Sequence, residues 1–118
     1  MVSIIDDDVI MRNATSRFIK SLGLNPHTFA SAEEFLGSGR VRDTSCVITD
    51  VQMPGLNGAE LQGELIAQGV STPMIFVTAF PEDSVRRRVL DAGAVGFLSK
   101  PFDEANLIGC LKTALGIG

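Results

Sequence analysis

Polar side chains of complementary chemistry follow four short apolar runs of this chain. The runs cover residues 2–5, 47–49, 74–77 and 95–98. The side chains that follow them are the carboxylates of Asp6, Asp7, Asp8 and Asp50, the hydroxyl of Thr78 and the ammonium of Lys100. If the runs are neighbouring parallel strands, these groups meet at one edge of one sheet, which is where open α/β sheets bind ligands. Such a set suits a metal-assisted site for moving a phosphoryl group.

The acidic side chains predict a metal site. Asp6 and Asp7 would lie close to Asp50 if the first and third strands are neighbours. Three carboxylates in one crevice repel one another, and an unpaired buried charge is costly. A hard divalent cation resolves this, because Mg²⁺ binds one or two carboxylates, keeps several waters and leaves positions for phosphate oxygens. Mn²⁺ is the alternative ion. Asp8 is instead expected to favour the N-terminus of the helix that follows it.

Asp50 is the candidate nucleophile. Attack of a carboxylate on phosphorus gives an acyl phosphate, an established form of covalent chemistry. The new group carries a charge of about −1.5 to −2 at neutral pH. Lys100 would supply a compact cation and Thr78 a hydroxyl donor to balance that charge.

The elements that must position these groups alternate along the chain. Short apolar strands are separated by stretches of helical period, which is typical of a parallel sheet with helices on both faces. A second strand at residues 25–30 has little apolar content and contains Pro26, so it is expected at an edge of the sheet. Five strand–helix units account for residues 1–118, which predicts a single domain, with any output domain absent or removed.

Helical periodicity and capping residues predict the buried faces and the ends of the helices. The predicted inward stripe of the first helix is Met11, Ala14, Phe18 and Leu22, with Gly23 ending the helix. In the fourth helix, Pro81 is expected in the first turn, and the predicted buried face is Val85, Val89 and Ala92. The last helix is expected to begin after Asp103 and to end at Gly116.

Composition narrows the class of protein. The 10 basic and 14 acidic side chains give a net charge of −4, so this domain is not expected to bind nucleic acid directly. No apolar stretch approaches the roughly 20 residues of a membrane span, and the start lacks the pattern of an export leader, which favours a cytoplasmic protein. Cys46 and Cys110 are expected to be buried free thiols.

Four motifs, in this order and at these spacings, carry a family resemblance. They are Asp6-Asp7, Asp50-x-x-Met53-Pro54-x-x-x-Gly58, Thr78-Ala79 and Lys100-Pro101-Phe102. Over its full length the chain resembles the receiver domain of bacterial two-component response regulators. The resemblance implies a flavodoxin-like three-layer sandwich, a doubly wound (βα)5 fold with a five-stranded parallel sheet in strand order 2-1-3-4-5.

The resemblance also implies a function and a set of ligands. Asp50 would receive a phosphoryl group from the phosphohistidine of a sensor histidine kinase, without the domain being an enzyme beyond its own phosphorylation and slow autodephosphorylation. Mg²⁺ would be bound directly by Asp7 and Asp50, through water by Asp6, and by the main-chain carbonyl of Gln52. The bond between Lys100 and the proline after it is a candidate for the cis form.

A switch follows from the same resemblance. Thr78 would move toward the phosphoryl group and Phe97 would rotate inward, remodelling the face formed by the fourth helix, the fifth strand and the fifth helix. The basic run Arg86, Arg87 and Arg88 on the fourth helix is either a solvated face or a docking surface for an acidic partner or a homodimer. Phe80 is expected to screen the phosphoryl group and slow its hydrolysis. Residues 93–102 look most like receivers fused to helix-turn-helix DNA-binding domains, which favours transcription regulation.

Two other classes of protein use related chemistry. Phosphatases with an aspartyl nucleophile, such as haloacid-dehalogenase-like enzymes, resemble Asp-x-Asp at the nucleophile, whereas Gln52 stands at the second position here. A flavodoxin-like nucleotide carrier would want glycines, serines or threonines after the first strand to cradle a phosphate. The acidic run at residues 6–8 would instead repel a phosphate unless a metal intervened.

Overall fold

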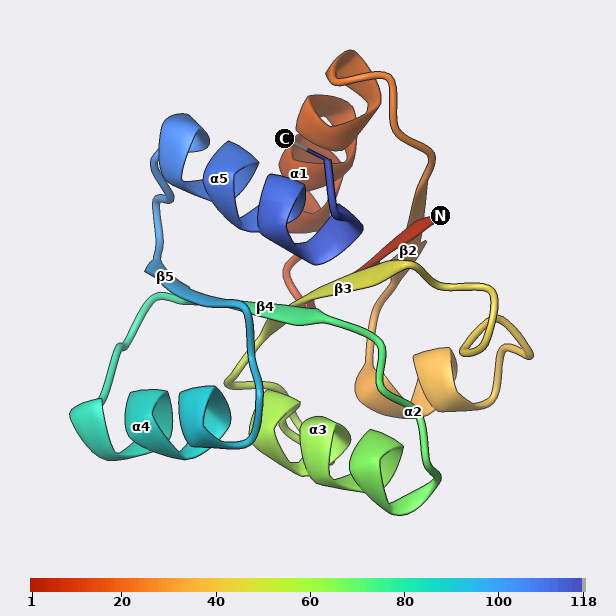
Figure 1. Cartoon of the computed structure of the whole chain (residues 1–118), viewed down its shortest axis with the longest axis vertical. Helices are drawn as coiled ribbons and strands as arrows, with labels where there is room; N and C mark the ends of the chain where they lie inside the picture. The colour runs from red at the N-terminus through yellow and green to blue at the C-terminus, as the bar shows by residue number, and fades with distance from the viewer. Residues whose placement is uncertain (118) are drawn as a thin grey trace.

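In the computed structural model, which describes residues 1–117, five parallel strands alternate with five helices (Figure 1). The elements are β1 (Val2–Ile5), α1 (Val9–Ser21), β2 (Pro26–Phe29), α2 (Ala32–Leu36), β3 (Cys46–Asp50), α3 (Gly58–Ala67), β4 (Met74–Thr78), α4 (Asp83–Asp91), β5 (Gly96–Ser99) and α5 (Glu104–Leu115). The strand order is β2-β1-β3-β4-β5. Helices α1 and α5 cover one face of the sheet, and α2, α3 and α4 cover the other. This is the predicted flavodoxin-like three-layer sandwich.

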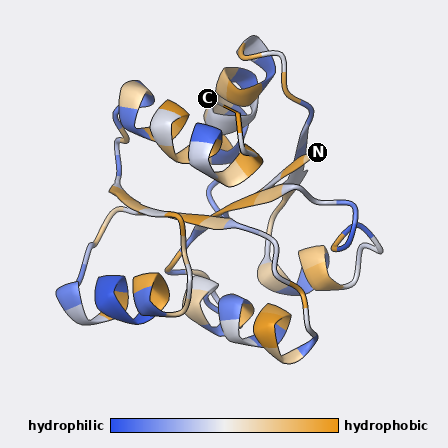
Figure 2. Cartoon of the chain, in the orientation of Figure 1, coloured by the Kyte–Doolittle hydropathy of each residue, from blue (hydrophilic) through white to orange (hydrophobic). Residues whose placement is uncertain are grey.

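The central strands are apolar on both faces because helices bury both. Every residue of β1, β3 and β4 is buried, and the sheet forms a hydrophobic band between more polar helix surfaces (Figure 2). Since side chains alternate along a strand, Ile4 and Ile48 pack on the α1 and α5 side, whereas Ile5 and Phe76 pack on the other. As predicted, β2 is an edge strand, paired with β1.

Strand register brings the polar strand ends to one edge. Ile5 pairs with Thr49. Asp6, directly after β1, and Asp50, the last residue of β3, therefore lie side by side at one edge of the sheet. Thr78 pairs with Ser99, directly before Lys100. Every strand is parallel, and the carboxyl ends therefore all face the same way, as the sequence predicted.

The first and last helices are capped as expected, but the inward stripe of α1 differs from the prediction. Asp8 accepts hydrogen bonds from the first-turn amides of α1, and Asp103 does the same for α5. The fully buried residues of α1 are Thr15 and Ile19, whereas Ala14 is exposed. A threonine at the centre of the buried stripe breaks the apolar periodicity. The predicted positions Ala14 and Phe18 therefore lie one residue before the buried positions Thr15 and Ile19.

Helix α4 begins later than predicted and is loosely attached. Pro81 precedes the N-cap residue Glu82 instead of lying in the first turn, and the Glu82 side chain makes no capping hydrogen bond. Ala92 lies beyond the last helical residue and is exposed, so it was wrongly placed on the buried face. Among the residues of α4 (Asp83–Asp91), all of which the structure describes, only Val89 is fully buried. Within residues 1–117, no helix is long and apolar enough to cross a membrane.

Candidate functional site

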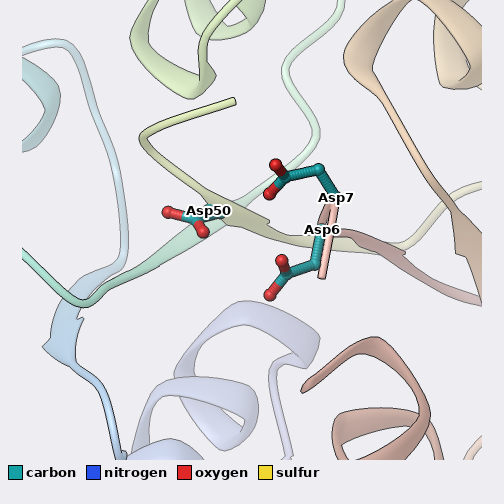
Figure 3. Close-up of side chains that lie close together, drawn as sticks. All are labelled: Asp6, Asp7 and Asp50. Carbon is teal, nitrogen blue, oxygen red and sulfur yellow. The ribbon is translucent and has the colours of Figure 1, made fainter. Parts of the chain in front are cut away.

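Three carboxylates converge at the carboxyl ends of β1 and β3. Asp6, Asp7 and Asp50 each offer an oxygen, and these oxygens lie within 4.8 Å of one another. Figure 3 shows Asp6 and Asp7 reaching from the end of β1 toward Asp50 at the end of β3. Asp6 is 6% exposed and Asp50 9% exposed, whereas Asp7 is exposed to solvent. The predicted acidic cluster is therefore assembled, with two buried members and one at the surface.

Lys100 bridges the two buried carboxylates. Its Nζ donates to Asp6 Oδ2 at 2.8 Å and to Asp50 Oδ2 at 2.9 Å. Burial by itself lowers the pKa of Lys100, but the hydrogen bonds and negative charges of the two aspartates outweigh it and raise that pKa above its ordinary value. The ammonium is therefore charged at neutral pH. Counted by formal charge, one ammonium and three carboxylates sum to −2.

Main-chain amides orient the other oxygens of the buried carboxylates. Gln52 N–H donates to Asp50 Oδ1 at 3.1 Å, and Asp8 N–H donates to Asp6 Oδ1 at 2.9 Å. The loop after β3 turns tightly, since Gly58 N–H donates to the Val51 carbonyl at 2.8 Å. A Cβ at Gly58 would overlap the main-chain carbonyl oxygen of Asp50, so this close approach of α3 to the end of β3 requires glycine.

The site opens to solvent through a crevice of about 510 Å³. It is lined by Asp7, Asp8, Met11, Asp50, Ala79, Lys100 and Pro101. Three oxygen donors of one cluster and a formal charge of −2 suit a hard divalent cation such as Mg²⁺, which prefers carboxylates and water. The residues present therefore fit the predicted metal. Gln52 lies beside Asp50, and the role of its carbonyl as a ligand stays a prediction.

The predicted switch residues lie on the neighbouring strands β4 and β5. Thr78 ends β4, is 1% exposed and accepts a hydrogen bond from Phe80 N–H at 3.2 Å through its Oγ1. Its carbonyl accepts Lys100 N–H at 2.8 Å, which fixes the end of β5 beside β4. Phe97 pairs with Phe76 and packs half-buried against the core on the side of α2, α3 and α4. The Thr78 hydroxyl thus accepts a loop amide and keeps its own hydrogen available to donate.

Three further predictions concern residues around the site. Phe80 is 68% exposed and does not line the crevice as the structure describes it, so screening by its ring stays a prediction. The peptide bond between Lys100 and Pro101 is cis, as expected. The arginines of α4 are all exposed, which agrees with either reading of that basic run: Arg86, Arg87 and Arg88.

Sequence reasoning missed two residues that hold the site together. Arg12 Nη1 donates to the main-chain carbonyl of Asp6 at 2.7 Å, which steadies the turn carrying the acidic residues. Its place one helical turn after the capping Asp8 would have indicated this. Glu33 Oε2 accepts Leu56 N–H at 3.0 Å across 23 residues of sequence, a contact with no local sequence pattern.

Comparisons with known proteins agree with this geometry. Residues 2–112 match the family described as response regulator receiver domain. Nodulation protein W of Bradyrhizobium diazoefficiens is 37% identical over 114 residues, covering 97% of this chain and 50% of that protein. Transcriptional regulatory protein FixJ of Azorhizobium caulinodans is 37% identical over 115 residues, covering 98% and 54%.

Solved structures extend the comparison. A response regulator receiver protein from Burkholderia phymatum is 39% identical with a TM-score of 0.84, covering 99% of this chain and 95% of that one. The chain spans about half the length of the curated relatives it matches. The family match over nearly the whole chain, together with these relatives, shows that the chain belongs to the receiver domain family of two-component response regulators.

Proposed function

We propose that this domain is a phosphorylation-activated switch whose phosphoryl acceptor is Asp50. One observation carries the choice of residue. Within the described residues, Asp50 is the carboxylate that both contacts Lys100 and lines the open crevice. Asp6 contacts the same ammonium but does not line the crevice, and Asp7 lines it without an ammonium partner. A phosphodonor entering the crevice therefore meets the Asp50 carboxylate beside a fixed positive charge.

The proposed reaction transfers a phosphoryl group from a phosphohistidine of a sensor histidine kinase. An Asp50 oxygen forms a bond to phosphorus, the bond between phosphorus and the histidine nitrogen breaks, and the imidazole leaves with the electron pair. Asp6, Asp7 and Asp50, with the Gln52 carbonyl, would hold Mg²⁺, which when bound supplies neutralising charge. The Lys100 ammonium, which contacts Asp50, would then bind the negatively charged phosphoryl oxygens. The domain would otherwise catalyse only its own slow dephosphorylation.

The proposed relay starts at Thr78. Its Oγ1 accepts the Phe80 amide in this structure and keeps its own hydrogen to donate to a phosphoryl oxygen, so a movement of Thr78 toward that oxygen would pull on the loop before α4. Phe97 lies on the same sheet face as Phe76 and would turn into the space that Thr78 leaves. Helix α4 can respond because it has one fully buried side chain and no side-chain N-cap. A phosphate mimic that leaves the Phe97 rotamer unchanged, in crystals or by NMR, would argue against this relay.

Incubation with acetyl phosphate and Mg²⁺ tests the acceptor directly. We expect one phosphate per chain, stable in acid and released by hydroxylamine, which identifies an acyl phosphate. The Asp50→Asn variant should gain none, because an amide oxygen is a poor nucleophile. Phosphate on Asp50→Asn, or none on the wild type, would overturn the assignment. In the same assay, Phe80→Ala should shorten the lifetime of the phosphate if the ring shields it.

The partners form the outer part of the proposal. Relatives of about twice this length include a transcriptional regulatory protein, which supports an output domain acting on transcription, fused or separate, in a cytoplasmic pathway. A phosphorylation-dependent homodimer through α4, β5 and α5 is part of the proposal, and the exposed Arg86, Arg87 and Arg88 are available to such an interface. If the phosphorylated Arg87→Glu variant dimerises as well as the wild type, the basic run is only a solvated face of α4. Because the chain belongs to the receiver family, the phosphatase and nucleotide-carrier alternatives lose support.

A further inference from the structure

The loop between β3 and α3, residues 51–57, is tied to a helix that is remote in sequence. At its two ends the loop is held by its own neighbours: Gln52 N–H binds Asp50, and Asn57 and Glu60 form a reciprocal capping box at the start of α3. Directly before Asn57 it is also held from α2, where Glu33 Oε2 accepts Leu56 N–H at 3.0 Å.

The loop and Glu33 fit one another closely. Gly55 has a φ of +75°, in the left-handed region that glycine tolerates best. A Cβ at this position would overlap the Glu33 carboxylate. The carboxylate therefore occupies the space that a side chain at position 55 would take. The hydrogen bond from the Leu56 amide also lowers the pKa of Glu33, so the acceptor is ionised at neutral pH.

The opposite side of the same loop faces open space. A cavity of about 510 Å³ lies between the loop and α4, lined by Val51, Gln52, Met53, Pro54, Asn57 and Val85. The buried side chains of Val51 and Met53 anchor the first part of the loop in the core, polar support near its end comes from Glu33 on the α2 side, and the α4 side offers room into which the loop can shift. Gln52 lies between the two, in the loop and at the cavity wall.

We propose that Glu33 is a positioning residue that holds this loop so that the Gln52 main chain faces Asp50. The inference rests on the proposed function, because Gln52 orients the acceptor carboxylate through its N–H and is expected to offer its carbonyl to the metal. Without the Glu33 contact, the loop moves toward the cavity, and both main-chain groups of Gln52 leave their positions. Asp50 would then lose an orienting donor, and a bound metal would lose the oxygen that the Gln52 carbonyl is expected to offer.

Binding of Mn²⁺ to the unphosphorylated domain, followed by electron paramagnetic resonance, tests this. Glu33→Ala should weaken Mn²⁺ binding by about three- to tenfold, the range that one ordinary hydrogen bond supports, because this contact is exposed to solvent. Glu33→Gln removes the charge but keeps an oxygen that can accept the Leu56 amide, so its affinity should stay within about twofold of wild type. Glu64→Ala removes an exposed negative charge from α3 and should match wild type.

The comparison of the Gln and Ala variants separates position from charge. Equal weakening in both would show a long-range charge effect and overturn the inference, as would no weakening in either. A second readout is amide hydrogen exchange of Leu56, which should accelerate in Glu33→Ala and stay slow in Glu33→Gln; unchanged exchange in Glu33→Ala would also overturn it. If the wild type fails to take phosphate from acetyl phosphate, the proposed function fails. If it does so while Glu33→Ala binds Mn²⁺ normally, only this inference fails.

Discussion

Replacing Lys100 by methionine removes the ammonium that separates Asp6 from Asp50 and keeps a similar side-chain length. The two carboxylates then face each other with no cation between them, and the formal charge of the cluster falls from −2 to −3. We expect this variant to be markedly less stable in the absence of divalent metal. Added Mg²⁺ should restore part of the loss, because the metal would take over the neutralising role.

The size of the effect follows from burial. Removing one partner of a fully buried ion pair costs about 3–5 kcal/mol, whereas exposed pairs contribute about 0–1 kcal/mol. The Lys100 side chain is 12% exposed and its partners are similarly buried, but the crevice beside them is open. An intermediate loss of about 2–3 kcal/mol is expected. With a urea m-value of about 1.5 kcal/mol/M, the unfolding midpoint should fall by roughly 1.3–2 M.

Urea unfolding at pH 7.5 with EDTA, followed by far-UV circular dichroism, measures this loss in a chain that has no Trp or Tyr. Lys112→Met, at an exposed lysine of α5, is the matched control and should change stability by less than about 0.5 kcal/mol. Because the pKa of Lys100 is raised, its contribution is complete below the ordinary lysine pKa and is lost only as pH rises through the raised value. The difference from wild type should therefore be constant between pH 7 and 9. A Lys100→Met variant as stable as wild type in EDTA would refute the reasoning.

Three other predictions test features of the fold around the site. Gly58→Ala should destabilise by about 1–3 kcal/mol in urea unfolding, because its Cβ meets the last carbonyl of β3, whereas Gly63→Ala in the same helix meets nothing and should stabilise by about 0.5–1 kcal/mol. Burial raises the pKa of the Cys46 thiol to about 12, so at pH 8 a disulfide reagent should label the half-buried Cys110 alone, and both thiols after unfolding; rapid native labelling of Cys46 would contradict this. The lowered pKa of Glu33 means that its contact is present above the ordinary pKa of 4.5 and is lost as pH falls through the lower folded value, so the loop amide that it binds should titrate by NMR below pH 4.5.

The acidic cluster was predictable because β1, β3 and β5 each lead into a charged residue where their apolar residues stop. Asp6 directly follows β1, Asp50 is the last residue of β3 and Lys100 directly follows β5, so parallel register alone brings them to one edge. That Lys100 binds both aspartates was not predictable, since a lysine at a strand end can equally point to solvent. The contact depends on the path of the chain after β5, which sequence spacing does not describe.

Other features escaped prediction for different physical reasons. Thr15 is buried although its side chain is polar, so apolar periodicity could not reveal the true stripe of α1. Proline is compatible with a first helical turn but does not require it, and α4 begins two residues after Pro81. The contact from Glu33 to Leu56 joins a side chain to a main-chain amide, which any residue except proline supplies. The identity of the residue that donates its main-chain amide therefore does not reveal such a contact.

The weak attachment of α4 has a consequence for how such domains diversify. Since Val89 alone of its side chains is fully buried, most substitutions along this helix should change stability by less than about 0.5 kcal/mol. Its outward residues can therefore be rewritten under selection with little penalty to folding. A cell that holds many similar regulators could use that freedom to keep parallel pathways from cross-talking.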